Sequence, residues 1–288
     1  MLVAEVSSNH RQDLGRCLEF VETAARIGCD AVKFQLFRLD RLFAPEILAA
    51  SKDHRQRREW ELPVSFIPEL AELARRRGLL FSCTAFDLEG VAELVPWVDF
   101  LKIASYELLW DELLETCART GKPVVLSTGM ADCGEIDHAV QALRCAGCSD
   151  LLLLHCVSGY PTPIQEANLS AIETLRKRYR CPVGWSDHTA QTAVWLRAVH
   201  RWQVSLLEFH LDLDGRGPEY AHGHCWLPRD AEKAIRLVRD GLAADGSGAK
   251  TPAGAELADR QWRADPADGL RPCRQVRQQW EREARCRQ

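Results

Sequence analysis

The chain has 288 residues, of which 46% are hydrophobic and 27% are charged, and its formal net charge is -4 at pH 7. This balance argues against bulk attraction to nucleic acid or an anionic membrane, and no run approaches the roughly 20 apolar residues of a membrane span. The N-terminus reaches Glu5 without a basic region and a long apolar run, so we expect no signal peptide and a cytoplasmic location. The 12 cysteines are scattered along the chain, which favours reduced thiols over a disulfide scaffold.

Short apolar runs that end in polar residues recur along the chain, separated by helical patterns with apolar residues three and four positions apart. The predicted strands cover residues 2–7, 31–35, 79–84, 100–105, 123–127, 151–156, 182–186 and 204–210. Apolar strands alternating with helices indicate a parallel α/β sheet, and eight strands close a barrel. We therefore predict a (β/α)8 TIM barrel over residues 1–244. A doubly wound open sheet is the alternative, but no glycine-rich phosphate loop follows the first strand.

Two segments depart from this strand–helix rhythm. Residues 37–62 follow the second strand and are rich in charge, so they are expected to be either a lid or rim over the pocket or a solvated excursion. Residues 245–288 are predicted to form a polar C-terminal tail with one terminal helix. Within it, residues 256–288 either lie against a barrel rim, anchored by Trp262 and Trp280, or form a solvated end.

Two histidines stand at or just after the ends of the last two predicted strands, 182–186 and 204–210. In a parallel barrel the C-terminal strand ends face one pocket, so His188 and His210 would point into the same cavity, within reach of one metal ion. The alternative is two unrelated histidines, one in a turn and one in the core. Imidazoles and water suit manganese, zinc or cobalt better than calcium.

Two lysines lie inside apolar runs of the predicted strands. Lysine is almost never buried without a partner, so Lys33 and Lys102 need an anion. One alternative is a structural salt bridge to Glu5 or Glu107. The other is a dianionic ligand, and several small hydroxyls near two cations favour a phosphate group. These hydroxyls belong to Thr84, Ser105, Ser127 and Ser186.

Long motifs in a fixed order make the chain resemble the sialic acid (N-acetylneuraminate) synthase family. The match runs from about residue 3 to about residue 240. It rests on AEVSSNH (4–10), AVKFQ (31–35), KIASYE (102–107), GKPVVLSTGM (121–130), LHCVSGYPTP (154–163), GWSDHT (184–189) and EFH (208–210). The resemblance implies a TIM barrel, a homodimer, and two substrates, phosphoenolpyruvate and an amino sugar.

The resemblance also implies ligands for particular residues. Phosphoenolpyruvate is expected on Lys33, Thr84, Lys102, Ser105, Ser127, Ser158 and Ser186. The sugar is expected near Glu5, Asn9, Gln35 and Tyr160, with Glu107 beside the reacting carbons. A divalent ion, usually manganese and alternatively magnesium or cobalt, is expected on His188 and His210. Glu219 stands where the family has aspartate and is expected to bind substrate in its place. His222 or His224 could displace or supplement a metal ligand.

The implied reaction condenses phosphoenolpyruvate with an N-acylated aminohexose, similar to N-acetylmannosamine, to give a nonulosonic acid and phosphate. The metal would polarise the sugar aldehyde for attack by the enol carbon. We assign Glu107 to steadying the charge that develops and taking a proton from water, and Glu5 to placing or protonating the aldehyde. The alternatives are a Schiff-base aldolase using Lys33 or Lys102, and a non-catalytic barrel that binds sugar phosphates or a partner.

The resemblance is incomplete at the C-terminal end. Typical members carry a further small domain, resembling antifreeze protein, that offers an arginine to the sugar in the partner's pocket. Too few residues follow the predicted barrel to build it. Arg260, Arg263 or Arg271 could take its place, a separate polypeptide could supply it, or the acceptor could differ.

Overall fold

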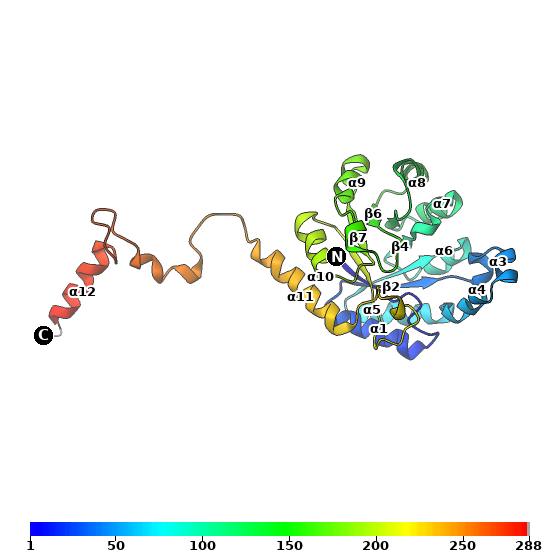
Figure 1. Cartoon of the computed structure of the whole chain (residues 1–288), viewed down its shortest axis with the longest axis horizontal. Coiled ribbons are helices and arrows are strands. Elements are labelled where there is room, and N and C mark those ends of the chain that lie inside the picture. The colour runs from blue at the N-terminus through cyan, green and yellow to red at the C-terminus, as the bar shows by residue number, and fades with distance from the viewer. Residues whose placement is uncertain (287–288) are drawn as a thin grey trace. The chain divides into compact units, whose positions relative to one another are not determined.

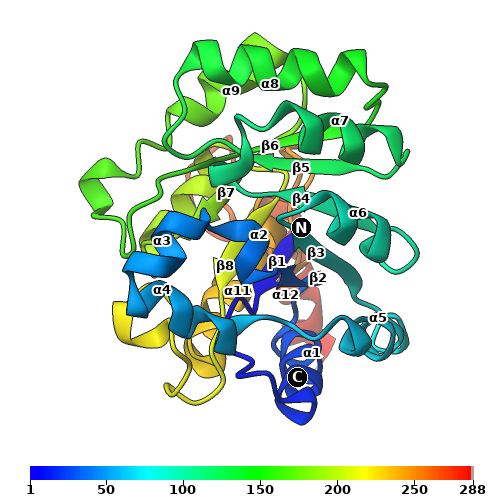
Figure 2. The same ribbon diagram turned by 90° about the vertical axis from the view of Figure 1, so that its right-hand side faces the viewer.

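The computed structural model describes residues 1–286, and its centre is a closed barrel of parallel strands (Figures 1 and 2). Each strand pairs with the next along the chain, and β1 also pairs with β8. The strands are β1 Leu2–Glu5, β2 Ala31–Leu36, β3 Leu80–Ala85, β4 Phe100–Ile103, β5 Val124–Ser127, β6 Leu151–Cys156, β7 Val183–Asp187 and β8 Leu207–His210. The predicted (β/α)8 barrel is confirmed.

Three strands are shorter than predicted by two or more residues, each for a local reason. β1 ends before Ser7, whose φ of 50° takes the backbone out of the extended region. β4 stops at Ile103 because the chain turns into a short helix over Ser105–Glu107. β8 begins only at Leu207, after the wide helical turn Arg197–Arg201.

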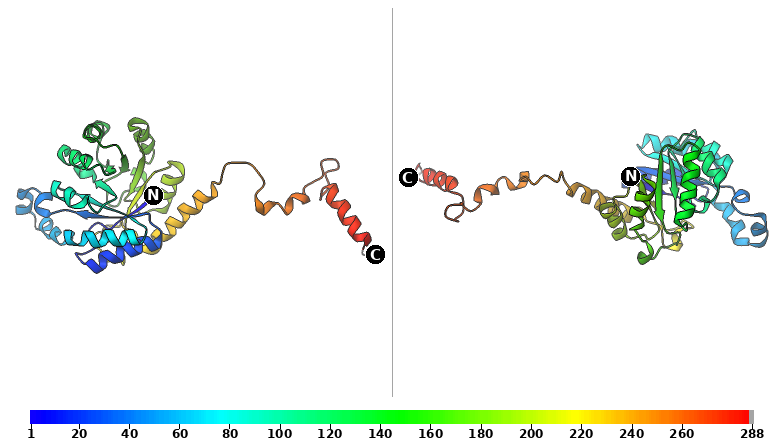
Figure 3. Two further views of the ribbon diagram at one scale, coloured as in Figure 1. Left: turned by 180° about the vertical axis from the view of Figure 1, so that it is seen from behind. Right: turned by 90° about the horizontal axis from the view of Figure 1, so that it is seen from above.

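Helices lie outside the barrel between successive strands, as all the views show (Figure 3). Each buries an apolar stripe against the strands; in α5, for example, Ile67, Leu70, Ala71 and Ala74 are buried. The helices between strands and after β8 are α1 Leu14–Ile27, α5 Ile67–Arg76, α6 Leu88–Leu94, α7 Asp111–Arg119, α8 Cys133–Cys145, α9 Ala171–Tyr179, α10 Thr192–Leu196 and α11 Pro228–Ala244. No described helix combines the length and apolar character needed to cross a membrane.

The barrel interior has an apolar layer with polar residues above it. Residues two positions apart on a strand face the same side. Val3, Ala31 and Phe100 belong to an apolar cluster, and two residues further along their strands stand Glu5, Lys33 and Lys102. The rest of this cluster is Val125, Leu154 and Leu206. The apolar layer therefore closes one end of the barrel and leaves the polar side chains at the C-terminal end.

The segment between β2 and α5 forms several short helices rather than one. These are α2 Leu39–Leu42, α3 Pro45–Ala50, α4 Lys52–Gln56 and the 3-10 turn Arg57–Trp60. Figures 1 and 2 both show α3 and α4 beyond the strands rather than among the outer helices. This segment is called the lid below, and it corresponds to the predicted excursion at 37–62.

Contacts divide the chain into two compact units, Met1–Leu242 and Ala243–Gln288. The second unit contains the expected terminal helix, α12 Arg274–Cys286, preceded by short 3-10 turns. Trp262 and Trp280 contact each other edge to face, with ring centroids 5.7 Å apart. The sequence-based boundary at residue 244 stays a prediction, as does the anchoring of these tryptophans on a barrel rim.

Candidate active site

A cavity of about 570 Å³ opens at the C-terminal ends of the strands. Most of the residues singled out from the sequence line it, and the structure therefore brings them together. They are Glu5, Lys33, Gln35, Thr84, Ser105, Glu107, Ser127, Tyr160, Ser186, His188, His210 and Glu219. The three others, Asn9, Lys102 and Ser158, are not among the lining residues.

Lys102 is a buried cation without a carboxylate partner. Its side chain is 2% exposed, and Nζ donates to Ser127 Oγ at 2.7 Å and to the Ile103 carbonyl at 3.0 Å. Within residues 1–286, no carboxylate lies within 4.0 Å of this nitrogen, so the possible salt bridge to Glu107 does not form. A buried ammonium with only neutral partners favours an external anion.

Lys33 differs from Lys102 because carboxylates surround it. Nζ forms an ion pair with Glu5, lies 3.7 Å from Glu208 Oε2, and donates to Thr84 Oγ1 at 3.2 Å. Burial lowers the pKa of Lys33 to about 8, although Glu208 opposes this shift. The salt bridge to Glu5, one of the two alternatives considered for Lys33, is therefore present.

Small side chains beside Lys102 converge around Gly129. The Ser105 hydroxyl accepts from Gly129 N at 3.0 Å and lies 3.2 Å from Cys156 Sγ. Ser158 Oγ is buried and has no hydrogen-bond partner among the described residues. A Cβ at Gly129 would collide with all three side chains, so only glycine fits here. The arrangement leaves hydroxyl donors free for an oxyanion.

Glu107 follows β4 and is poised to exchange a proton near neutral pH. Burial raises the pKa of its carboxyl to about 7, against the opposing effect of Lys102. Its Oε2 atom is buried without a hydrogen-bond partner in the described chain. A carboxyl group with this pKa, facing a cavity, is suited to general acid–base catalysis.

His188 presents a free ring nitrogen to the pocket. Its Nδ1 lies 2.7 Å from the Val157 carbonyl and must donate to it, which leaves the Nε2 lone pair free. Burial is the main cause that lowers the pKa of His188 to about 3, and the neighbouring His210 is the second cause. The ring is therefore neutral at pH 7. The His188 and His210 rings have centroids 5.3 Å apart, and Tyr160 packs on both. The two imidazoles expected to share a metal are therefore neighbours.

The segment after β8 folds back over the pocket and adds two polar side chains. Leu211 pairs with Trp226, so the chain between them forms a loop. In it, Glu219 Oε2 lies 2.9 Å from His210 Nδ1 and 3.5 Å from His224 Nε2. Burial alone would raise the pKa of Glu219. The interactions with His210 and His224 outweigh burial and hold this pKa well below its usual value.

Asn9 supports this loop instead of lining the cavity. Its Oδ1 accepts from Glu219 N at 3.1 Å, and its Nδ2 donates to the Leu211 carbonyl at 3.0 Å. Gly217 allows the close approach, because a Cβ there would collide with Asn9 and Asp212. The geometry thus gives Asn9 a positioning contact, and its predicted contact with sugar stays a prediction.

Sequence reasoning assigned no role to Glu208, which faces the pocket. Its Oε1 accepts from Ser186 Oγ at 3.1 Å. Burial favours its neutral form, but the charges of Lys33 and Lys102 outweigh this and lower the pKa of Glu208. The alternation of side chains along a strand could have identified Glu208, because it precedes His210 by two residues and shares its face of β8.

The lid contributes to the pocket, as expected of a rim. Its lining residues are Phe37, Leu42, Phe43, His54, Arg57 and Trp60. The Arg57 guanidinium lies over the rings of Phe43 and Trp60, 5.5 Å and 5.2 Å from their centroids. Among the described residues it has no ion-pair partner. The sequence showed the charge of this segment but not which of its arginines faces inward.

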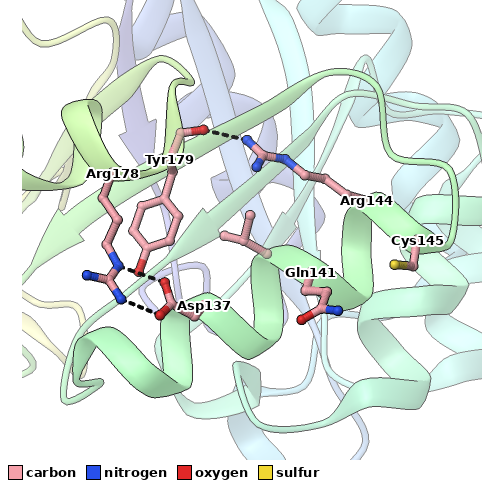
Figure 4. Close-up of a pocket in the computed structure, with 7 residues that line it drawn as sticks. Asp137, Gln141, Arg144, Cys145, Arg178 and Tyr179 are labelled. Atoms are coloured by element: carbon pink, nitrogen blue, oxygen red, sulfur yellow. Dashed lines mark hydrogen bonds and ion pairs between the residues drawn. The ribbon is translucent and has the colours of Figure 1, made fainter.

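A second cavity, between α8 and α9, offers no comparable chemistry (Figure 4). The Arg178 guanidinium pairs with Asp137, with Nε 2.7 Å from Oδ1, and Arg144 donates to the Tyr179 carbonyl. Arg178 and Asp137 therefore pair with each other, and Arg144 is bound to a backbone carbonyl. Cys145 also lines this cavity and is a free thiol at the end of α8.

Comparisons with known proteins point to one family. The NeuB family pattern matches residues 20–250. The chain is 39% identical over 264 residues to the uncharacterized protein MJ1065 of Methanocaldococcus jannaschii, covering 88% of this chain and 74% of that one. It is 34% identical over 277 residues to N,N'-diacetyllegionaminic acid synthase of Legionella pneumophila, covering 90% and 77%. The crystal structure of N-acetylneuraminic acid (sialic acid) synthetase from Leptospira borgpetersenii, in complex with citrate, matches with a TM-score of 0.79 and 31% identity, covering 90% and 89%.

Proposed function

The chain belongs to the NeuB family, and on this basis we propose that it condenses phosphoenolpyruvate with an N-acylated aminohexose. One water is consumed, and the products are a nonulosonic acid and inorganic phosphate. The observation that carries this proposal is Lys102, a buried cation with no carboxylate partner in the described chain, beside free hydroxyls. The names of the Legionella and Leptospira relatives support the class of product.

Phosphoenolpyruvate would supply the anion that Lys102 lacks, since the partners of its Nζ in the described chain are a hydroxyl and a carbonyl. Its phosphate and carboxylate together would meet two ammonium groups and several hydroxyl donors, which strengthens each hydrogen bond by charge. Lys33 is already paired with Glu5, so an anionic ligand would stabilise the buried charge of Lys102 more than that of Lys33. The full proposed set is Lys33, Thr84, Lys102, Ser105, Ser127, Ser158 and Ser186.

A divalent ion, manganese by family expectation and alternatively magnesium or cobalt, would be held by His188 and His210. The residues fit, because His188 is neutral and directs a free nitrogen toward the cavity. When bound, such an ion supplies Lewis-acid polarisation of the acceptor carbonyl. Imidazole ligands are compatible with manganese and cobalt, and less so with calcium.

Glu107 and Glu5 are the proposed catalytic carboxylates. With a pKa of about 7, Glu107 is partly ionised at neutral pH and can take a proton from the attacking water. Glu5 is held against Lys33 and accepts from Ser7 N at 2.7 Å, so its carboxylate is fixed in orientation. We place Glu5, Asn9, Gln35, Tyr160 and Glu219 on the acceptor side, where the aldehyde and hydroxyls of the sugar would lie.

A Schiff-base aldolase is the second candidate, because the pKa of Lys33 is lowered to about 8. The ion pair with Glu5 disfavours it, since a paired ammonium is a poor nucleophile. Borohydride reduction in the presence of substrate separates the two mechanisms. Covalent trapping on Lys33 or Lys102 would contradict the phosphoenolpyruvate condensation.

The proposal is tested by incubating the full chain with phosphoenolpyruvate, manganese and a panel of N-acylated aminohexoses and their 6-phosphates. We expect phosphate release with at least one acceptor, and a product whose mass equals both substrates plus water minus phosphate. Lys102→Met should raise the Michaelis constant for phosphoenolpyruvate roughly ten- to a hundredfold, as expected for about 1.5–3 kcal/mol.

Lys122→Met is the matched control for Lys102→Met, because Lys122 Nζ donates to the Val98 carbonyl and does not line the pocket. Its Michaelis constant should match the wild type. Absence of phosphate release with every acceptor would refute the proposed function. Light scattering of the same preparation tests the expected homodimer.

A further inference from the structure

The loop after β8 brings additional metal-binding groups close to His210, beyond the pair formed by His188 and His210. One ligand atom each from His210, Glu219, His224 and Cys225 lies within 4.8 Å of the others. His188 is outside this group, although its ring is near those of His210 and His224. The pocket thus contains two overlapping sets of candidate ligands that share His210.

We propose that His210, Glu219 and His224 form a metal centre that binds a divalent transition-metal ion without substrate, with His188 at its edge. This deepens the proposed function, because the same ion would serve the condensation. It changes the ligand set given above for this ion, because Glu219 and His224 join His210 as ligands without substrate, and His188 lies at the edge. The Cys225 thiol belongs to the group, but Asn9 Nδ2 donates to it at 3.6 Å, so we do not assign it as a ligand.

The separations of the three side chains fit a common ion. Ligands bound at about 2.1 Å to one ion lie about 3.0–3.5 Å apart. Glu219 Oε2 is 2.9 Å from His210 Nδ1 and 3.5 Å from His224 Nε2, and the two rings have centroids 4.7 Å apart. One carboxylate oxygen therefore stands between two imidazoles at separations close to those of a coordination polyhedron.

His224 has unused capacity to bind. It is 3% exposed, its Nε2 has only the long contact to Glu219, and its Nδ1 has no partner among the described residues. A buried imidazole whose two nitrogens lack good hydrogen-bond partners destabilises the folded protein unless a ligand binds it.

The surroundings hold Glu219 in place for this role. Its backbone N–H donates to Asn9, and its second carboxylate oxygen accepts from Ser7 Oγ. Such supporting contacts orient metal ligands. Two imidazoles and a carboxylate select zinc, cobalt or manganese, with zinc and cobalt bound more tightly than manganese.

The test is titration of the chelator-stripped full chain with Co²⁺, without substrates, by calorimetry and by visible absorption. We expect one ion per chain. His224→Ala and Glu219→Gln should each weaken binding at least about tenfold. His138→Ala is the matched control, because His138 lies on the surface, pairs with Asp111 and does not line the pocket, and it should bind Co²⁺ like the wild type.

His188→Ala distinguishes this centre from the two-histidine site. If the proposal holds, it weakens substrate-free binding less than His224→Ala does. The reverse order, or wild-type affinity in both His224→Ala and His224→Gln, would overturn it. Circular dichroism checks that the variants fold, and His224→Gln keeps a polar group of similar size. The titration needs neither substrate, so failure of the condensation assay leaves this test intact.

Discussion

The two sides of the pocket are built differently. The cation side, defined by Lys33, Thr84, Lys102 and Ser127, consists of residues on strands whose register is set by the barrel. On the imidazole side, defined by His188, His210, Glu219 and His224, the first two stand at the ends of β7 and β8, whereas the last two depend on a loop that folds back after β8. Strand residues are positioned by many backbone hydrogen bonds, whereas loop residues depend on a few contacts such as those of Asn9. The positions of Glu219 and His224 therefore depend on fewer contacts than those of the cation side.

The largest expected effect is loss of the imidazole shared by both candidate ligand sets. His210→Ala should reduce phosphate release at least about a thousandfold, because Lewis-acid stabilisation of a transition state is worth several kcal/mol. Added manganese should not restore the rate. His138→Ala is the control, since His138 lies on the surface and pairs with Asp111. Near-normal turnover of His210→Ala in chelator would show that the imidazole side is not a catalytic metal site.

On the cation side, the two lysines should differ in stability. Lys33→Met leaves Glu5 and Glu208 buried without their partner and should lower the free energy of unfolding by about 3–5 kcal/mol. Lys102→Met removes a buried charge that has no carboxylate partner, so it should cost little or even stabilise the protein. Urea unfolding of both variants without ligand measures the difference. Equal destabilisation would mean that Lys102 has an ionic partner in solution.

The pH dependence should report Glu107. Because its folded pKa of about 7 exceeds its ordinary value of 4.5, the folded carboxyl holds its proton more tightly. Its contribution to stability is present below pH 4.5 and is lost as pH rises through about 7. As a general base it needs the ionised form, so kcat/KM should rise with pH through about 7. Glu107→Gln should remove this limb and the associated change in stability, and an unchanged pH profile would exclude the assignment.

The smallest expected effect concerns the lid. Arg57 lies over two aromatic rings with its guanidinium free, so we expect it to contact oxygen atoms of the acceptor. Arg57→Met should raise the acceptor Michaelis constant roughly two- to tenfold, as for about 0.5–1.5 kcal/mol, without changing that for phosphoenolpyruvate. Arg58→Met is the control, because Arg58 pairs with Asp40 and does not line the pocket. A shift confined to phosphoenolpyruvate would place Arg57 on the other substrate.

Much of the barrel was determined by the sequence alone. Eight apolar runs with polar ends predict eight inward-facing polar positions, because strands have a period of two and parallel strand ends share one face. Lys33, Lys102, His188 and His210 could be chosen for this reason. The lid was visible as an interruption of the strand–helix rhythm.

Only the tertiary structure decided which partners these side chains have. Glu5 and Glu208 meet Lys33, and no carboxylate meets Lys102, because strand pairing sets which neighbours face each other across the barrel. Glu219 and His224 reach His210 because Gly217 and Asn9 let the loop fold close against the segment that follows β1. Contacts between residues as far apart in the chain as Asn9 and Glu219 depend on how the loop packs, and no local pattern records that.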